Sequence, residues 1–139
     1  MKLKIHPAEP GLPLPLFLSS IAAGFPSPAD DYLDDALDLN QLLVTHPAAT
    51  FFVRVQGESM AEANIHSGDV LVVDRSAEPK DRSIVVAVIN GEFTVKRIKK
   101  KGKKILLLPE NPSFPPIEVD EMADFQVWGV VTYVIHKAK

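Results

Sequence analysis

Short spacing between β-strand patterns is the feature that most limits what this chain can fold into. From residue 50 onward, runs rich in valine, isoleucine and phenylalanine alternate with turn residues. These runs predict strands at 50–56, 69–74, 83–89, 92–98, 103–108 and 125–136, with a short strand at 117–119. The connections leave no room for crossover helices, so neighbouring strands are expected to run antiparallel. We therefore predict a mainly β domain built on a curled, largely antiparallel sheet.

One hairpin of this sheet has a specific turn signal. Asn90-Gly91 separates the runs 83–89 and 92–98. A two-residue type I′ turn needs a positive φ at both central residues, and asparagine followed by glycine is the pair that tolerates it best.

The chain has a different character before residue 50. Prolines are dense there, at positions 7, 10, 13, 15, 26, 28 and 47. Because proline lacks an N–H group and disfavours helix in the preceding residue, residues 1–27 are predicted to form an extended amino-terminal arm. Residues 29–43 are interpreted either as a helix with Ser27 as its N-cap and Leu33 and Leu37 on its apolar stripe, or as an irregular tether. The expected organisation is a regulatory arm and tether over 1–49 and a β-rich domain over 50–139.

Composition excludes several classes of protein. The 139 residues fit one domain, and 46% hydrophobic residues supply a core, while a net charge of −3 gives no sign of general polyanion binding. Without cysteine there is no thiol nucleophile, and the four histidines lack the close spacing of metal ligands, so we expect no metal and no cofactor. The amino terminus is too polar for a signal peptide and no segment could span a bilayer, which favours a cytoplasmic protein.

Ser59 and Lys96 are the residues that point to chemistry. Ser59 lies in Gly57-Glu58-Ser59-Met60, at the junction between the strand 50–56 and a loop, and Lys96 lies in the strand 92–98. A serine can attack a carbonyl if a base removes its proton, and a lysine can be that base once burial removes its charge. About one free lysine in 2,500 is neutral at pH 7, but burial can lower the pKa by about 3–5 units.

Each of these residues also has a simpler interpretation. A serine after a glycine is usually a turn residue, and Lys96 could be a solvated strand lysine like those at 99, 100, 101, 103 and 104. Those five are interpreted as a solvated turn rather than a nucleic-acid patch, because no aromatic residues lie among them. A Ser-His-Asp arrangement would need a histidine beside Ser59, and His66 is only the nearest along the chain.

Five motifs together carry a resemblance to a known family. They are Ala22-Ala23-Gly24-Phe25, Gly57-Glu58-Ser59-Met60, Gly68-Asp69-Val70-Leu71-Val72-Val73-Asp74, Gly91-Glu92-Phe93-Thr94-Val95-Lys96-Arg97 and Leu108-Pro109-Glu110-Asn111. In order and spacing the chain resembles the LexA/UmuD family of self-cleaving serine-lysine peptidases, of peptidase family S24 type, over nearly its whole length. Phe25-Pro26-Ser27-Pro28-Ala29 and Asp38-Leu39-Asn40-Gln41-Leu42-Leu43 narrow the resemblance to members that serve as accessory subunits of error-prone translesion DNA polymerases.

The resemblance implies roles for particular residues. It puts the nucleophile on Ser59 and the general base on Lys96. It puts the oxyanion hole on the backbone amides of Glu58 and Ser59. The scissile bond falls between Ala23 and Gly24, so the chain would carry its own substrate.

The resemblance also implies partners and a cellular role. Cleavage in this family is prompted by RecA filaments on single-stranded DNA, as part of the SOS response to DNA damage. The shortened form is then expected to be a homodimer that joins the UmuC polymerase subunit, with the replicative polymerase and the sliding clamp as further candidate partners. LexA carries a helix-turn-helix domain ahead of the same catalytic domain. Only about fifty residues precede it here, so we expect no sequence-specific DNA binding.

One departure from the family pattern bears on the turn before the strand 83–89. The family usually has Gly-Asp where this chain has Arg82-Ser83, which puts the geometry of that turn in question without touching Ser59 or Lys96. A non-catalytic module that binds a polymerase or RecA without cutting is the main alternative function. A signal-peptidase-like processing enzyme also uses serine and lysine, but no membrane anchor is expected and the cut site lies within this chain.

Overall fold

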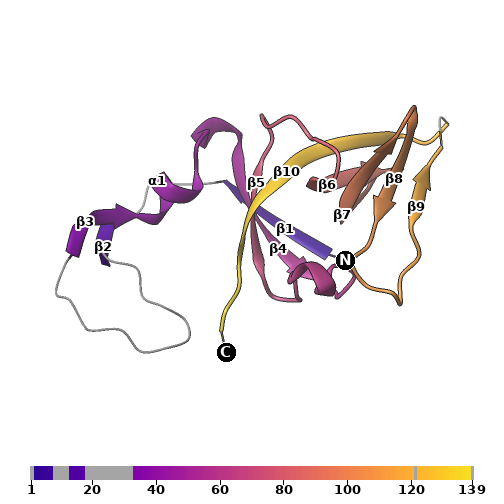
Figure 1. Cartoon of the computed structure of the whole chain (residues 1–139). Helices are drawn as coiled ribbons and strands as arrows, with labels where there is room; N and C mark the ends of the chain where they lie inside the picture. Colours follow the sequence, from indigo (N-terminus) through magenta and orange to yellow (C-terminus); the bar gives the residue numbers. More distant parts are fainter. Residues whose placement is uncertain (1, 8–12, 18–32, 121, 139) are drawn as a thin grey trace.

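The centre of the molecule is an eight-stranded sheet in the order β1-β4-β5-β10-β6-β7-β8-β9. The computed structural model describes residues 2–7, 13–17, 33–120 and 122–138. The strands of the sheet are β1 (Lys2–Pro7), β4 (Thr50–Gln56), β5 (Val70–Asp74), β6 (Ile84–Ile89), β7 (Glu92–Lys101), β8 (Lys104–Leu108), β9 (Ile117–Val119) and β10 (Phe125–Ile135). The sheet curls strongly, and its edge strand β1 also approaches β7 (Figure 1).

The predicted strands after residue 50 all form, and every pair of neighbours in the sheet is antiparallel. The prediction of a mainly β, curled and largely antiparallel sheet is therefore confirmed. Asn90 and Gly91 join β6 to β7 with φ values of 49° and 81°, the two positive angles that the type I′ turn requires. β7 runs three residues beyond its predicted end, because Lys99, Lys100 and Lys101 continue the ladder with β8.

The region before residue 50 differs from the prediction. β1 was not predicted as part of the sheet, yet it pairs with β4 from Lys2 opposite Gln56 to Pro7 opposite Phe51. β2 (Pro13–Phe17) pairs with β3 (Leu33–Asp38) in a separate two-stranded sheet, which Figure 1 shows to one side of the main one. The helix interpretation of 29–43 is therefore wrong over 33–38, and among the described residues of that range only α1 (Leu39–Leu43) is helical.

The short helix has a local cause. Asp38, not Ser27, is the N-cap of α1, and its side chain accepts a hydrogen bond of 2.9 Å from the Asn40 amide. Aspartate is a weak residue inside helices and a strong one at their start, because its carboxylate competes for backbone N–H groups. The pairing of β2 with β3 is a contact between distant segments that a local helical pattern does not reveal. Ser27 lies outside the described residues.

Two 3₁₀ turns, Pro47–Ala49 and Ala61–Ala63, complete the elements that the structure describes. Of the helices in these residues, none has the length and apolar character needed to cross a membrane.

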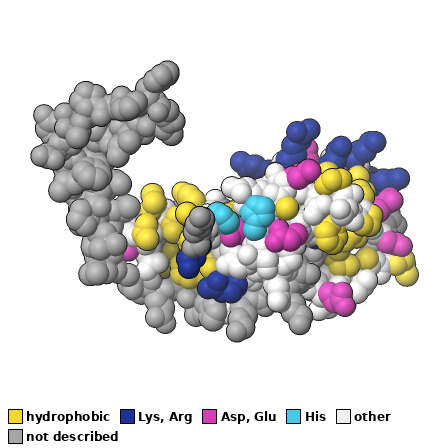
Figure 2. Space-filling view, turned by 90° about the horizontal axis from the view of Figure 1, so that it is seen from below, with side chains coloured by type: hydrophobic (Ala, Val, Ile, Leu, Met, Phe, Trp, Pro, Cys, Tyr) yellow, Lys and Arg dark blue, Asp and Glu magenta, His cyan; other side chains and the backbone are white. Residues whose placement is uncertain are grey.

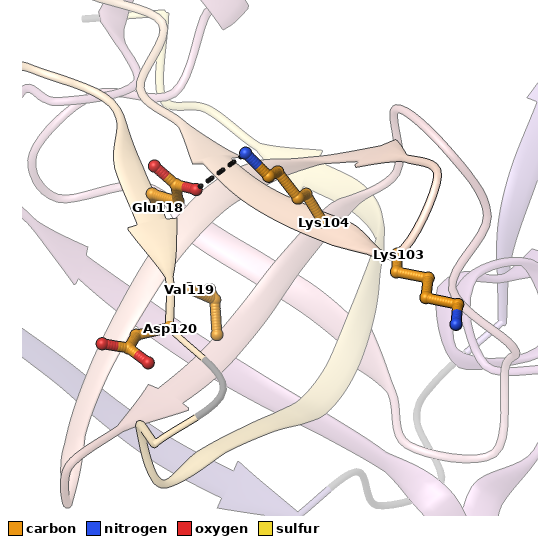
Figure 3. A pocket seen from close by; sticks show the side chains of 5 residues that line it. All are labelled: Lys103, Lys104, Glu118, Val119 and Asp120. Carbon is orange, nitrogen blue, oxygen red and sulfur yellow. Dashed lines mark ion pairs between the residues drawn. The ribbon is translucent and has the colours of Figure 1, made fainter.

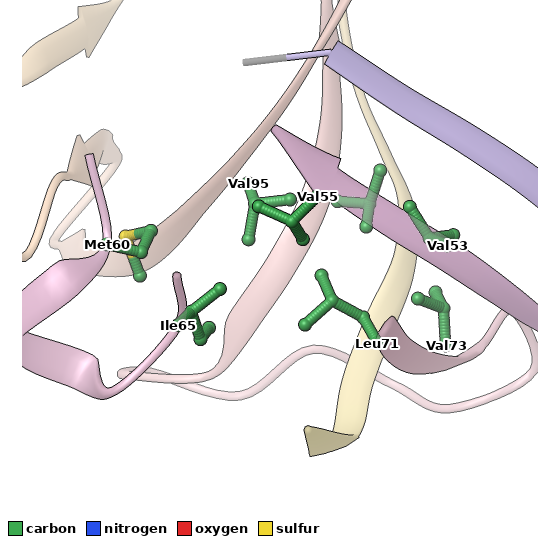
Figure 4. Close-up of a cluster of buried hydrophobic side chains, with 8 residues drawn as sticks. Val53, Val55, Met60, Ile65, Leu71, Val73 and Val95 are labelled. Atoms are coloured by element: carbon green, nitrogen blue, oxygen red, sulfur yellow. The ribbon is translucent and has the colours of Figure 1, made fainter. Parts of the chain in front are cut away.

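Hydrophobic clusters fill both faces of the sheet. The first contains Val53, Val55, Met60, Ile65, Leu71, Val73, Val86 and Val95 (Figure 4). The second contains Val85, Ala87, Ile98 and Leu107. Because side chains alternate along a strand, Val95 belongs to the first face while its neighbour Lys96 points to the same face as Ile98. A lysine in the middle of β7 is thus buried.

Gly129 is a point of close approach inside β10. A Cβ atom there would lie 2.5 Å from Cγ1 of Val73, whose side chain is fully buried. We expect Gly129→Ala to lower the free energy of unfolding by about 1–3 kcal/mol, since extra volume in a packed core forces strain. Urea denaturation measures this. Adding Val73→Ala should relieve the clash, so strictly additive effects of the two changes would contradict it.

The turn at Arg82 keeps a left-handed backbone although the family glycine is missing. Arg82 has a φ of 72°. Its amide donates to the Ile98 carbonyl at 2.8 Å, and its carbonyl accepts from Nη1 of Arg97 at 2.7 Å. The Ser83 hydroxyl accepts from the Lys80 amide at 3.0 Å. Local hydrogen bonds therefore hold the turn.

Arg82→Gly should stabilise the protein. A left-handed conformation costs a non-glycine residue about 1–2 kcal/mol, and the greater freedom of glycine in the unfolded chain offsets part of the gain. We expect a rise of up to ~1 kcal/mol in the free energy of unfolding, measured with urea. Arg82→Ala is the control and should give no rise, because it keeps the Cβ atom. A gain with alanine as well would show that the effect comes from the lost side chain.

Candidate active site

The structure brings Ser59 and Lys96 together although 37 residues separate them along the chain. Nζ of Lys96 lies 2.9 Å from Oγ of Ser59, and the two residues are only 6% and 5% exposed. The interpretation of Lys96 as a solvated strand lysine is therefore wrong. In the described part of the chain no histidine bonds to Ser59, so a Ser-His-Asp arrangement has no support there.

Three oxygen atoms surround the Lys96 amine. Besides Ser59 Oγ, Nζ contacts Oγ1 of Thr94 at 2.9 Å and the Val95 carbonyl oxygen at 3.1 Å. An ammonium group would donate to all three. A neutral amine has two protons and one lone pair, so it can donate to Thr94 and Val95 and accept the proton of the Ser59 hydroxyl. The geometry thus fits the form of lysine that can act as a base.

Burial lowers the pKa of Lys96 from its ordinary value, because water no longer solvates the charged ammonium. Val85 lies opposite Lys96 on β6. None of the described carboxylates forms an ion pair with Lys96 to counter this effect. The neutral amine is therefore favoured more than in a free lysine.

A tight loop between β4 and the turn Ala61–Ala63 holds Ser59. Gly57 begins it with a φ of 116°, which residues with side chains rarely adopt. The residue after the serine, Met60, places its fully buried side chain in the first hydrophobic cluster beside Ile65 (Figure 4). The loop is thereby anchored on both sides of Ser59.

The backbone around Ser59 leaves two amides available. The Glu58 carbonyl accepts from Nδ2 of Asn111 at 2.8 Å and from the Ala61 amide at 3.2 Å, and the Ser59 carbonyl accepts from the Glu110 amide at 2.9 Å. Within the described residues, the amides of Glu58 and Ser59 donate to no protein acceptor. Their assignment as an oxyanion hole stays a prediction, which these free donors support.

Four further residues build this site, and no sequence pattern predicted a role for them. Thr94 contacts the Lys96 amine, and Asn111 and Glu110 donate to the carbonyls of Glu58 and Ser59. Arg97 forms an ion pair with Glu110 and so ties that loop to β7, one residue from Lys96. The available signal was the motif Leu108-Pro109-Glu110-Asn111, which carried the family resemblance without a stated function.

His66 lies near the site but contacts Glu58 rather than Ser59. Hydrogen bonds from the Ser67 amide at 3.2 Å and from His66 Nδ1 at 3.1 Å lower the pKa of the Glu58 carboxyl. Asp69 accepts from the His66 amide at 2.8 Å and lies 2.6 Å from His136 Nδ1. Histidine and acidic side chains are neighbours on the face shown in Figure 2. In the described residues no group of three or more potential ligands is placed to hold a metal ion.

A groove lies at the start of β7 and includes Thr94, a neighbour of the Lys96 amine. Its volume is about 720 Å³, and it is lined by Ile89, Asn90, Glu92, Phe93, Thr94 and Ile117. Thr94 is the residue that bonds to the Lys96 amine. The apolar residues Phe93 and Ile117 are 39% and 37% exposed.

A second pocket of about 580 Å³ lies at β8 and β9 and carries an ion pair of 3.8 Å between Lys104 and Glu118 (Figure 3). Neither Ser59 nor Lys96 lines either of these two pockets, and only the first contains a residue bonded to Lys96.

The predicted cleavage residues, Ala23 and Gly24, lie outside the described residues. The assignment of that bond therefore stays a prediction.

A buried serine in contact with a buried lysine, on a mainly antiparallel sheet, is the arrangement that a serine peptidase with a lysine base requires. The sequence matches the family described as Peptidase S24-like over residues 15–132. This chain belongs to that family, and its relatives are of the UmuD type.

Three relatives illustrate the match. Protein SamA of Salmonella typhimurium is 50% identical over 125 residues, which cover 90% of this chain and 86% of SamA. Protein MucA of Escherichia coli is 48% identical over 121 residues, covering 86% of this chain and 82% of MucA. The LexA repressor of Acidithiobacillus ferrooxidans is 45% identical over 126 residues, covering 88% of this chain and 60% of the repressor. The family resemblance seen in the motifs is confirmed.

The lowered pKa of Lys96 should make stability depend on pH. An unfolded lysine keeps its proton up to a pKa of about 10.4, whereas the buried amine loses it at lower pH. Between the two pKa values the unfolded state binds more protons, so the free energy of unfolding rises with pH, by at most about 1.4 kcal/mol per unit.

Urea denaturation of the wild type and of Lys96→Met between pH 7 and 10 measures this effect. The wild type should gain stability relative to the variant as the pH rises. The exposed Lys99, changed to Met, is the control and should give a constant difference. A constant difference for Lys96→Met as well would mean that Lys96 titrates alike in the folded and unfolded states.

Proposed function

We propose that this protein acts in the SOS response to DNA damage and cuts itself between Ala23 and Gly24, with Ser59 as nucleophile and Lys96 as general base. The observation that carries the proposal is the 2.9 Å contact between two buried side chains, Lys96 Nζ and Ser59 Oγ. Membership of the peptidase S24-like family and the UmuD-like relatives support it.

The neighbours of the dyad support a complete reaction sequence. The neutral Lys96 amine takes the hydroxyl proton while Ser59 Oγ attacks the Ala23 carbonyl carbon. The amides of Glu58 and Ser59 donate to the oxygen that becomes negative, and each such donor is typically worth about 3–4 kcal/mol. Lys96 returns the proton to the Gly24 nitrogen as the peptide bond breaks. Water, deprotonated by Lys96, then hydrolyses the ester on Ser59 and completes the cut.

The groove along β7 is the proposed place for the segment around the cut. Its lining includes Thr94, which contacts the amine, and the apolar side chains of Phe93 and Ile117. The small side chains of alanine and glycine suit an approach in which a backbone carbonyl must come close to a buried hydroxyl. The glycine also allows the chain to bend there.

Docking of this segment must be controlled, since a precursor with a permanently occupied site would not persist. We propose that the docked form is a minor population and that a RecA filament on single-stranded DNA binds it more tightly, because a partner shifts an equilibrium only through such a difference. The shortened protein is then proposed to act in the cytoplasm as a homodimer with UmuC in translesion synthesis. The replicative polymerase and the sliding clamp are further proposed partners.

A non-catalytic module that binds without cutting is the alternative function. Its only support was the Arg82-Ser83 departure from the family pattern. Arg82 keeps a positive φ of 72°, and the dyad contact is formed.

Cleavage should accelerate with pH. Below the pKa of the buried Lys96, the neutral fraction grows about tenfold per pH unit, so the rate should follow it and level off above that pKa. Purified protein incubated between pH 7 and 10 and analysed by intact mass measures this. Ser59→Ala should abolish the cut and leave the circular dichroism spectrum unchanged. A flat rate would argue against a lysine base, and cutting by Ser59→Ala would place the nucleophile elsewhere.

The same mass measurement tests the proposed activation. RecA, single-stranded DNA and a nucleoside triphosphate should produce, near neutral pH, a fragment that begins Gly24-Phe25-Pro26. Omitting the DNA is the control and should suppress the cut. An intact chain in the complete mixture would favour a module that binds without cutting.

A further inference from the structure

The loop after β8 forms a hydrogen bond to the peptide group between Glu58 and Ser59. Nδ2 of Asn111 donates to the Glu58 carbonyl oxygen at 2.8 Å, across 53 residues of sequence. Oδ1 of the same side chain accepts from the Ser113 amide at 2.9 Å. With its oxygen engaged by an N–H group, the Asn111 amide has only one orientation that satisfies both contacts, with the nitrogen toward Glu58.

Glu110, the residue before Asn111, holds this loop through three interactions. The Glu110 amide donates to the Ser59 carbonyl at 2.9 Å, and the Glu110 carbonyl accepts from the Glu62 amide at 2.7 Å. The Glu110 carboxylate pairs with Arg97 on β7. Asn111 is therefore held by a framework that contacts both the nucleophile loop and the strand of Lys96.

The hydrogen bond from Asn111 to the Glu58 carbonyl also determines where the Ser59 N–H points. The Glu58 carbonyl and the Ser59 N–H belong to one planar trans peptide group, so they point in opposite directions. Fixing the carbonyl oxygen on Asn111 therefore fixes the direction of the Ser59 N–H. Within the described residues this amide has no protein acceptor, and it is one of the two donors proposed for the oxyanion.

We propose that Asn111 is a positioning residue that aims the Ser59 amide at the substrate oxygen. The inference rests on the proposed self-cleavage function and deepens it. Asn111 touches neither Oγ of Ser59 nor the Lys96 amine, so its effect is on stabilisation of the oxyanion and not on the general base. A donor helps only when it lies about 2.7–3.1 Å from the place where the negative oxygen forms, so a small rotation of the peptide is enough to lose its contribution.

Asn111→Asp isolates the donor. The change keeps the size of the side chain and the oxygen that accepts from Ser113, but it places a carboxylate oxygen against the Glu58 carbonyl. The two oxygens repel, and the peptide should turn away. Asn64→Asp is the matched control, because it makes the same chemical change at an exposed position close to the nucleophile loop.

The cleavage rate between pH 7 and 10 separates the possible roles. For Asn111→Asp we expect a plateau rate at least tenfold below the wild type and an unchanged pH midpoint, because that midpoint reports Lys96. Asn111→Ala, which adds no charge, should show a smaller loss with the same midpoint, and it answers the question if the aspartate variant does not fold. Asn64→Asp should follow the wild type.

A small fluorophosphonate provides a readout that does not depend on docking of the arm. Ser59 Oγ displaces fluoride from phosphorus, and the phosphoryl oxygen then occupies the position of the oxyanion. Phosphonylation, followed by intact mass, should slow in Asn111→Asp by a factor similar to that for cleavage. A purely structural role would lower the thermal midpoint without lowering both rates at temperatures where the variant is folded.

The outcomes distinguish this inference from the function on which it rests. If the wild type does not cut itself, the proposed function fails. If the wild type cuts and Asn111→Asp has the same plateau, the positioning role is wrong. A shifted pH midpoint would instead assign Asn111 to the lysine. Slower cleavage with unchanged phosphonylation would assign it to docking of the arm, and either result overturns the proposal.

Discussion

The contact between a buried amine and a buried hydroxyl is the interaction on which the rest of this structure depends. Lys96 lies in the middle of β7, where burial keeps water away from its amine and lowers its pKa. Burying this lysine lowers stability when the amine is protonated, because the charged ammonium loses its water and no carboxylate of the described residues pairs with it. The fold tolerates this at a site where a neutral amine has chemical value, as expected when function and stability compete.

In the proposed reaction, the amine can act only if Ser59 is held against it. Three separate parts of the chain do this. Met60 anchors the nucleophile loop in the core, Thr94 shares the amine with Ser59, and the segment Glu110–Asn111 holds both carbonyls beside Ser59. The Arg97–Glu110 ion pair joins that segment to β7, so the strand of the base and the loop of the nucleophile are braced by the same few residues. Rigid support of this kind is what reactive geometry requires.

Sequence patterns predicted the part of the fold that local rules control. Alternating apolar residues and short connections gave the strands from β4 to β10, and Asn90-Gly91 marked a turn that indeed has two positive φ angles. The same reasoning failed where pairing partners are distant. β1 completes the sheet beside β4, and β3 pairs with β2 instead of continuing a helix with α1. Asp38 shows why local patterns were not enough here, since an aspartate can end a strand or cap a helix, and Asp38 does both.

The sequence by itself determined the strand order along the chain, the loop that presents Ser59 and, through motifs, the family. It also pointed to Ser59 and Lys96, because a serine and a lysine side chain can supply a nucleophile and a base. Only the tertiary structure decided that Lys96 is buried and lies 2.9 Å from Ser59, and that Asn111 faces the Glu58 carbonyl. The physical reason is that burial and hydrogen-bond direction depend on several segments that pack around the same space. The sequence of one segment does not show which distant segments will pack against it and exclude water.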